Sequence, residues 1–206
     1  ARIRSRSAQH KGGSVTKPPD VLVVPTGTAN LAAVIACFRR LGAEAAVSCD
    51  ADRIAEADRV VLPGVGAFEP AWTALSSSGA AQALRERISA DRATLGICLG
   101  MQLLAEGSTE SNVPGGLGVL PGQATEFDPT IRVPQMGWNQ VHAPEGARCL
   151  TTGYAYFANS YRLPVPDDDA GWVVATTDHG GHFWSAAERG RTLACQFHPE
   201  LSGAFG

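Results

Sequence analysis

The sequence of 206 residues has little net charge, no long apolar run and no closely spaced pair of cysteines. A formal net charge of −3 gives no electrostatic reason to expect nucleic acid or an anionic membrane as a partner. No apolar stretch approaches the roughly 20 residues of a transmembrane helix, so we expect no membrane span. The five cysteines are scattered without a C-x-x-C pair, which argues against a disulfide framework or a zinc ribbon and for the reducing cytoplasm.

Residues 1–19 also lack the apolar segment of a secretory signal peptide. They are basic and polar, and their cationic residues are Arg2, Arg4, Arg6, Lys11 and Lys17. We expect residues 1–19 to form a disordered or basic N-terminal arm, with an electrostatic docking tail as the alternative. Residues 20–206 are long enough to form one domain with a sizeable core.

Short apolar runs alternate with amphipathic segments between residues 20 and 105. The predicted strands are 20–24, 45–49, 59–62 and 93–97, and the predicted helices are 30–41, 69–75, 80–88 and 99–105. This alternation predicts an α/β fold whose mostly parallel sheet is covered by helices on both faces. From about Gly122 onward, short β-type runs between Gly, Pro and Asp turns predict a mixed or antiparallel, helix-poor half: 123–127, 139–142, 154–158, 172–176, 182–187 and 192–197.

Cys98 stands where a predicted strand passes directly into a predicted helix, with Gly96 and Gly100 on either side. This Gly-x-Cys-x-Gly frame allows a sharp turn like the nucleophile elbow of the serine hydrolases. The start of the following helix favours a thiolate, and the N–H of Leu99 points to where an oxyanion would form. The alternative, a buried inert thiol, is what we expect for the cysteines in ordinary helix, strand or loop patterns: Cys37, Cys49, Cys149 and Cys195.

His198 and Glu200 follow another apolar run and are predicted to alternate on an extended segment, stiffened by Pro199, so that both side chains face the same way. A neutral imidazole near Cys98 would deprotonate the thiol and later protonate a leaving amine, while Glu200 holds the ring. The predicted catalytic residues are therefore Cys98, His198 and Glu200. His179 and His182 have no third ligand nearby in sequence, so we expect no metal and no cofactor.

The loop Pro63-Gly64-Val65-Gly66 lacks the Lys-Ser/Thr of a phosphate-binding loop and the full dinucleotide spacing. Its N–H groups are better suited to face a reacting carbonyl. The alternative is an ordinary turn between a strand and a helix.

Together, the elbow, the His-Pro-Glu motif and the Pro-Gly-Val-Gly-Ala-Phe loop resemble class I glutamine amidotransferases. A finer similarity is to the glutaminase subunits of imidazole glycerol phosphate synthases, and it extends over about residues 21–206. The segments that carry this finer similarity are Pro134, Met136-Gly137-Trp138-Asn139, Tyr156-Phe157 and Ser160-Tyr161.

The resemblance implies a flavodoxin-like fold and a cytoplasmic heterodimer that hydrolyses L-glutamine through a glutamyl thioester. Its ammonia would pass to a (β/α)₈-barrel cyclase, the synthase subunit, which forms imidazole glycerol phosphate and aminoimidazole carboxamide ribotide in histidine biosynthesis. The implied oxyanion site is Gly64, Val65, Gly66 and Leu99. The implied glutamine-binding residues are Gln102, Glu110, Asn159, Ser160 and Tyr161. The implied partner interface includes Asn30, Gln135, Trp138, Asn139 and Leu201.

The chain departs from the family pattern away from the triad. Its first loop reads Pro-Thr-Gly-Thr-Ala-Asn instead of an acidic-aromatic pair before Gly-x-Gly-Asn, and the family has a further helix after the position of Gly206. Gln135 and Asn159 replace histidines, and Leu201 replaces a lysine. These differences suggest a paralogue that supplies ammonia to a different synthase in a specialised pathway.

Three further alternatives remain open. The Gly-Val-Gly loop and residues 136–139 count against another class I amidotransferase with a different acceptor. The two-residue spacing of His198 and Glu200 counts against an esterase with Cys in the elbow, which would need an acid between nucleophile and base. The intact triad counts against a non-catalytic scaffold subunit.

Overall fold

A computed structural model describes residues 20–27, 30–166 and 168–206, so the predicted N-terminal arm lies outside the described residues. Within this part the helices are α1 (Leu31–Arg40), α2 (Ala51–Glu56), α3 (Phe68–Ser77), α4 (Ala80–Ser89), α5 (Leu99–Leu104) and a 3₁₀ helix, η1 (Pro199–Leu201). The strands are β1 (Val21–Val23), β2 (Ala45–Val47), β3 (Arg59–Gly64), β4 (Ala93–Cys98), β5 (Gly107–Ser108), β6 (Gln123–Glu126), β7 (Gln135–Val141), β8 (Gly153–Asn159), β9 (Tyr161–Pro164), β10 (Val173–Asp178), β11 (His182–Arg189) and β12 (Thr192–Cys195).

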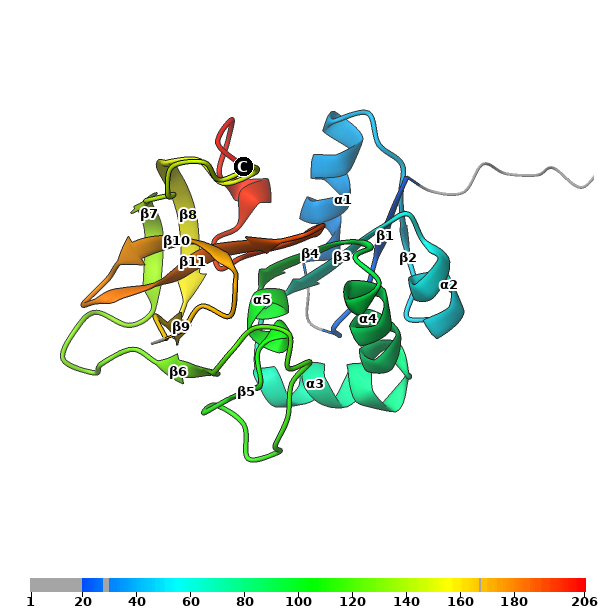
Figure 1. Cartoon of the computed structure of the whole chain (residues 1–206), viewed down its shortest axis with the longest axis horizontal. Coiled ribbons are helices and arrows are strands. Elements are labelled where there is room, and N and C mark those ends of the chain that lie inside the picture. The colour runs from blue at the N-terminus through cyan, green and yellow to red at the C-terminus, as the bar shows by residue number, and fades with distance from the viewer. Residues whose placement is uncertain (1–19, 28–29, 167) are drawn as a thin grey trace, which may run out of the picture.

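One sheet runs through the whole molecule in the order β2-β1-β3-β4-β12-β11-β9-β6-β5, with β10 paired to β11 (Figure 1). The pairings from β2 to β12 are all parallel. Beyond β12, the pairings β12–β11, β11–β9, β11–β10 and β9–β6 are antiparallel, and β7 and β8 form a separate antiparallel pair. The predicted change from a parallel to a mixed half is therefore confirmed, and β12 is where the two halves join.

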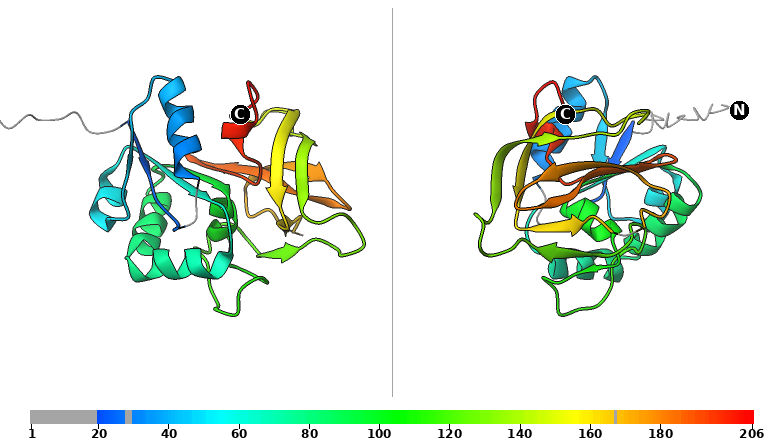
Figure 2. Two further views of the ribbon diagram at one scale, coloured as in Figure 1. Left: turned by 180° about the vertical axis from the view of Figure 1, so that it is seen from behind. Right: turned by 60° about the vertical axis from the view of Figure 1, so that its left-hand side comes forward.

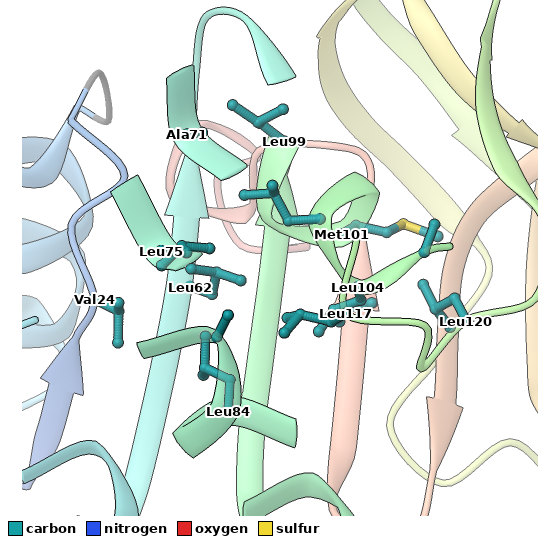
Figure 3. Close-up of a cluster of buried hydrophobic side chains, with 14 of the residues drawn as sticks. Val24, Leu62, Ala71, Leu75, Leu84, Leu99, Met101, Leu104, Leu117 and Leu120 are labelled. Carbon is teal, nitrogen blue, oxygen red and sulfur yellow. The ribbon is translucent and has the colours of Figure 1, made fainter. Parts of the chain in front are cut away.

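The parallel half is buried on both faces because successive side chains along each strand point in opposite directions. In β1, Val21 and Val23 pack into one core cluster, while Leu22 packs into the other. One cluster receives side chains from α2 and, as Figure 3 shows, from α3, α4 and α5. The other receives α1 and the β7–β8 pair. Figure 2 shows α1 on the opposite side of the sheet from α3 and α4, which confirms the prediction of helices on both faces.

Helix α2 is absent from the sequence-based prediction. It has six residues and one buried side chain, Ile54, so it lacks a repeating apolar stripe. Its start is fixed by Asp50, whose carboxylate accepts a hydrogen bond from the N–H of Arg53 at 2.9 Å. The short strands β5 and β9 were likewise not predicted, and β7 begins at Gln135, earlier than expected.

The buried guanidinium of Arg87 ties α2, α4 and β4 together. It donates hydrogen bonds to the carbonyls of Ile54, Ala57 and Ala93 and to Thr94 Oγ1. Burial, together with the charge of Arg92, lowers the pKa of Arg87 to about 10. This side chain therefore anchors the start of β4, the strand that ends at Cys98.

No helix within the described ranges is long and apolar enough to cross a membrane.

Candidate active site

Cys98 occupies a strained turn at the carboxyl end of β4. Its backbone has φ 53° and ψ −112°, and α5 begins at the next residue. The glycines on either side are needed because the chains approach closely there. A Cβ on Gly96 would lie 2.9 Å from Leu104 Cδ1, and a Cβ on Gly100 would lie 1.8 Å from the carbonyl oxygen of Leu62. The predicted elbow is confirmed, and it is the cysteine itself, not a glycine, that takes the positive φ.

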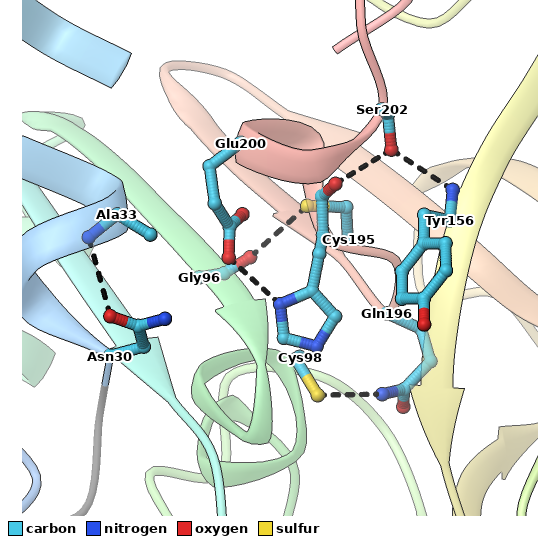
Figure 4. A network of polar contacts seen from close by, with 10 residues as sticks. Asn30, Ala33, Gly96, Cys98, Tyr156, Cys195, Gln196, Glu200 and Ser202 are labelled. Carbon is cyan, nitrogen blue, oxygen red and sulfur yellow. Dashed lines mark hydrogen bonds and ion pairs between the residues drawn. The ribbon is translucent and has the colours of Figure 1, made fainter. Parts of the chain in front are cut away.

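His198 and Glu200 meet as predicted, but the backbone between them is not extended. Pro199 is the first residue of the 3₁₀ helix η1, with His198 at its N-cap. The expectation of an extended segment stiffened by Pro199 is wrong, because proline also fits the first residue of a helix, which needs no N–H donor. In this turn His198 Nδ1 lies 2.9 Å from Glu200 Oε1 (Figure 4).

Two neighbouring residues fix the backbone of His198. Its N–H donates to the carbonyl of Tyr156 on β8 at 2.9 Å. The buried hydroxyl of Ser202 donates to the carbonyl of His198 at 2.6 Å and accepts the N–H of Tyr156 at 3.0 Å. Sequence reasoning missed Ser202, because a serine two residues after Glu200 carries no distinguishing pattern.

The imidazole of His198 is buried between Glu200 and Cys98. Burial alone would lower the pKa of His198, but hydrogen bonds to Cys98 and Glu200, and their charges, raise it to about 10. A pKa of about 10 favours the imidazolium at neutral pH, which is the form that the predicted transfer of the thiol proton to a neutral imidazole would produce. Since the raised value lies above the ordinary 6.5, the stability from this charge is fully present below pH 6.5 and is lost as the pH rises through about 10.

We expect the Cys98→Ala variant to have a His198 pKa below that of the unsubstituted chain, because the substitution removes a hydrogen-bond partner and a negative charge. Histidine NMR signals followed against pH measure this change. The matched control is Cys49→Ala, at an exposed cysteine, which should leave the His198 titration in place. An unchanged His198 titration in Cys98→Ala would mean that the sulfur does not hold the proton on the ring.

A second buried cysteine, Cys195, lies near Cys98 but differs from it in chemistry. Burial, with the nearby charges of Glu200 and Cys98, raises the pKa of Cys195 well above its usual range. Its thiol donates to the carbonyl of Gly96 at 3.8 Å. Cys195 is thus held as a neutral thiol, consistent with its predicted structural role.

A cavity of about 380 Å³ opens at Cys98 and His198. This volume is in the range of small-molecule sites. Its wall contains all of the predicted glutamine-binding residues and most of the predicted oxyanion residues: Gln102, Glu110, Asn159, Ser160, Tyr161, Val65, Gly66 and Leu99. The remaining oxyanion residue, Gly64, is paired directly with Cys98 in the β3–β4 register. Segments far apart in sequence therefore converge on one sulfur atom.

Two of these residues are fixed by hydrogen bonds. Glu110 Oε2 accepts the N–H of Phe68 at 2.9 Å, at the first residue of α3, which holds the carboxylate against the cavity. Gln102 Nε2 donates to the carbonyl of Tyr161 at 3.1 Å and to Gln196 Oε1 at 2.9 Å. Gln196 stands two residues before His198, and sequence reasoning gave it no role. In the described ranges no group of three or more His, Cys, Asp and Glu side chains is placed to hold a metal ion.

Comparison with known proteins identifies the family of this chain. The family model for class I glutamine amidotransferases matches residues 22–204. The chain belongs to the class I glutamine amidotransferase family.

Similar proteins point to one branch of this family. The imidazole glycerol phosphate synthase subunit HisH of Synechococcus sp. (strain JA-3-3Ab) is 41% identical over 192 residues, covering 89% of the chain and 88% of that protein. The chloroplastic imidazole glycerol phosphate synthase hisHF of Arabidopsis thaliana is 39% identical over 198 residues, covering 94% of the chain. The chain spans only 33% of the length of the Arabidopsis protein.

A solved structure of a glutamine amidotransferase superposes with a TM-score of 0.70 at 21% identity, covering 87% of this chain and 90% of the other. This likeness bears on the fold alone. Together with the family match, it confirms the predicted class I glutamine amidotransferase fold.

The amidotransferase residues expected at a partner interface differ in exposure. Trp138 is 58% exposed and Leu201 is 48% exposed. Asn30 is exposed and caps α1 by accepting the N–H of Ala33 at 3.3 Å, and the side chain of half-buried Asn139 donates to the carbonyl of Asp178 at 2.9 Å. Gln135 is only 4% exposed, so its side chain would need a rearrangement to touch a partner.

Proposed function

We propose that this amidotransferase chain hydrolyses L-glutamine to glutamate and ammonia, with Cys98 as the nucleophile. The observation that carries the proposal is that Cys98 and His198 line one cavity of about 380 Å³, with Glu200 hydrogen-bonded to His198. Cys98 Sγ attacks the carbon of the side-chain amide, and the electron pair of the carbonyl moves onto its oxygen. When this tetrahedral adduct collapses, the C–N bond breaks and the His198 imidazolium gives its proton to the departing ammonia.

The resulting γ-glutamyl thioester is resolved by water. His198, now neutral, takes a proton from the attacking water, and the second tetrahedral adduct expels the Cys98 thiolate and releases glutamate. Glu200 accepts the hydrogen bond from His198 Nδ1 and stabilises the ring whenever it is charged. The triad thereby returns to its starting protonation state.

Backbone N–H groups of Leu99 and of the Gly64-Val65-Gly66 loop are proposed to hold the developing oxyanion. Support comes from the β3–β4 register, which places Gly64 opposite Cys98, and from the cavity wall, which contains Val65, Gly66 and Leu99. Such donors lower the barrier because they face the oxygen only once it becomes charged.

The amino-acid end of glutamine is proposed to lie against Gln102, Glu110, Asn159, Ser160 and Tyr161. The carboxylate of Glu110 is suited to the ammonium of glutamine because it is held in place by Phe68. The amide oxygen of Asn159 is buried without a hydrogen-bond partner among the described residues, and it supplies a second acceptor at the wall.

Ammonia is proposed to pass to a (β/α)₈-barrel synthase subunit that makes imidazole glycerol phosphate. Two relatives carry the name of that synthase, and the Arabidopsis protein is much longer than this chain. Exposed apolar side chains lie near the cavity, where a partner would cover them: Met136, 65% exposed, lines the cavity, and Trp138 follows it on β7. Covering this mouth would keep ammonia out of bulk water, where it is mostly protonated and not nucleophilic.

The proposal is tested by measuring glutamate release from glutamine with and without a histidine-pathway synthase subunit. We expect the rate of glutamate release to rise on addition of the synthase. The control is the same synthase with a chain inactivated at Cys98. Absence of release in both conditions would favour the scaffold alternative. A rate of glutamate release that does not change when the synthase is added, together with no binding of the synthase to this chain, would favour a paralogue with another acceptor.

A further inference from the structure

Gln196 connects the wall of the cavity to the reactive sulfur. It follows β12 directly, its side chain is 0% exposed, and its N–H donates to the carbonyl of Ser185 at 2.9 Å. Its side-chain Nε2 donates to Cys98 Sγ at 3.5 Å (Figure 4). Its Oε1 accepts from Gln102 Nε2 at 2.9 Å. No step of the reaction described above uses Gln196.

The direction of these hydrogen bonds is fixed by the carbonyl of Tyr161. A backbone carbonyl only accepts hydrogen bonds, so the group of Gln102 that lies 3.1 Å from it must be the NH₂. The second hydrogen of that NH₂ needs an acceptor, which is Gln196 Oε1. The other end of the Gln196 amide, its NH₂, must therefore face Cys98. The row of amides thus presents a donor, and not an acceptor, to the sulfur.

We propose that Gln196 is a further catalytic residue, a neutral donor that stabilises the thiolate of Cys98 and is held in that orientation by Gln102 and Tyr161. This rests on the proposed function only in taking Cys98 as the nucleophile. A donor strengthens its hydrogen bond when the acceptor becomes charged, so Gln196 favours the thiolate over the thiol. The thiolate is the form that attacks carbonyl carbon.

The titratable groups around the sulfur explain why a neutral donor is useful there. His198 supplies the positive charge, and Glu200 lies behind it on η1. The other acidic groups near the sulfur are Cys195 on β12 and two cavity residues, Glu110 and Tyr161. A negative charge on any of these disfavours a thiolate. The amide of Gln196 opposes this effect without gaining or losing a proton.

The test is the rate at which iodoacetamide alkylates Cys98 as a function of pH, with the site located by mass spectrometry of peptides. In Gln196→Glu the shape is kept and the carboxylate still accepts from Gln102, but it offers the sulfur an acceptor. We expect the pH midpoint of Cys98 alkylation to rise by about one unit or more, which is about a tenfold slower reaction near neutral pH. Gln196→Met, which offers neither donor nor acceptor, should raise the midpoint by less.

Gln102→Glu provides a second, independent variant. Its carboxylate can only accept, so the Gln196 amide should rotate, turn its NH₂ toward residue 102 and present its oxygen to Cys98. We expect the midpoint for Cys98 to rise here too, although residue 196 is unchanged. Exposed Cys49 and Cys149 serve as internal references in every sample, because their alkylation profiles should stay the same.

A Cys98 profile that is unchanged in folded Gln196→Met would overturn the proposal and indicate that Gln196 only fills space, because this substitution removes the donor without adding a charge. Folding of each variant is checked by its thermal unfolding curve. The alkylation assay needs neither glutamine nor a synthase, so its outcome is independent of glutamate release. A chain that releases no glutamate but shows the shift in Gln196→Met would refute the proposed hydrolysis and leave the role of Gln196 toward the thiolate in place.

Discussion

Replacing Cys98 with alanine should lower the rate of glutamine hydrolysis by about 10⁴-fold or more, the scale seen when a nucleophile is removed from a triad. The fold should be kept, because alanine removes one sulfur atom from a side chain that borders a cavity. Without the sulfur no thioester forms, and the imidazolium of His198 has no adduct to protonate. Glutamate release at saturating glutamine measures the loss.

Chemical labelling gives this substitution a second readout. The glutamine mimic 6-diazo-5-oxo-norleucine should attach to Cys98 in the unsubstituted chain and to no cysteine in Cys98→Ala. The matched control is Cys149→Ala, at an exposed cysteine, which should keep both glutamate release and labelling. Mass spectrometry that places the label on a cysteine other than Cys98 would contradict the assignment of the nucleophile.

Gly100→Ala should lower the free energy of unfolding by about 4 kcal/mol or more, the range reserved for severe packing defects. Helix propensity alone predicts the opposite, because alanine stabilises a helix interior by roughly 1 kcal/mol relative to glycine. A steric clash outweighs this preference and makes the substitution destabilising. The added Cβ would lie 1.8 Å from the carbonyl oxygen and 2.8 Å from the carbonyl carbon of Leu62, and both belong to the backbone of β3. Helix α5 and β3 must therefore separate.

Denaturant unfolding curves measure this effect, with Gly107→Ala as the matched control. Gly107 is also buried, but its added Cβ would have its nearest neighbours at 3.7 Å, an ordinary contact distance. We expect Gly107→Ala to change the free energy of unfolding by no more than about 1 kcal/mol. Equal stability of the two variants would show that α5 is not packed against β3 as described.

The sequence was sufficient to predict the parallel half of the fold and the parts of the site that depend on local pattern. Strands buried on both faces, such as β3 and β4, read as continuous apolar runs. The glycines around Cys98 indicated a tight strand-to-helix turn. The candidate catalytic residues Cys98, His198 and Glu200 were predicted from the chemistry of their side chains. The strands and the turn are specified by residues close together in the chain, whereas the set of Cys98 with His198 and Glu200 was inferred from the chemistry of residues far apart.

Features that depend on distant contacts could not be predicted in this way. The role of Gln196 requires knowing that β12 lies beside β4, and that of Ser202 requires the position of β8. Helix α2 has too few buried residues for periodicity to show. The extended geometry predicted around Pro199 failed because proline is compatible with the first turn of a helix as well as with a strand. The charge on His198 depends on its hydrogen bonds to Cys98 and Glu200, which outweigh the effect of burial and form only in the folded chain.

The position of β12 between β4 and β11 has a consequence for biosynthesis. While the ribosome makes the chain, β3 and β4 can pair early. The other edge of β4 stays unpaired until residues 192–195, which form β12, have been synthesised. This is a pairing of high sequence separation, the kind that slows folding and leaves a strand edge open to wrong partners. Insertion of β12 closes that edge and brings His198 to Cys98 in the same event. In the proposed reaction, a nascent chain therefore has no base beside Cys98 until β12 has paired with β4.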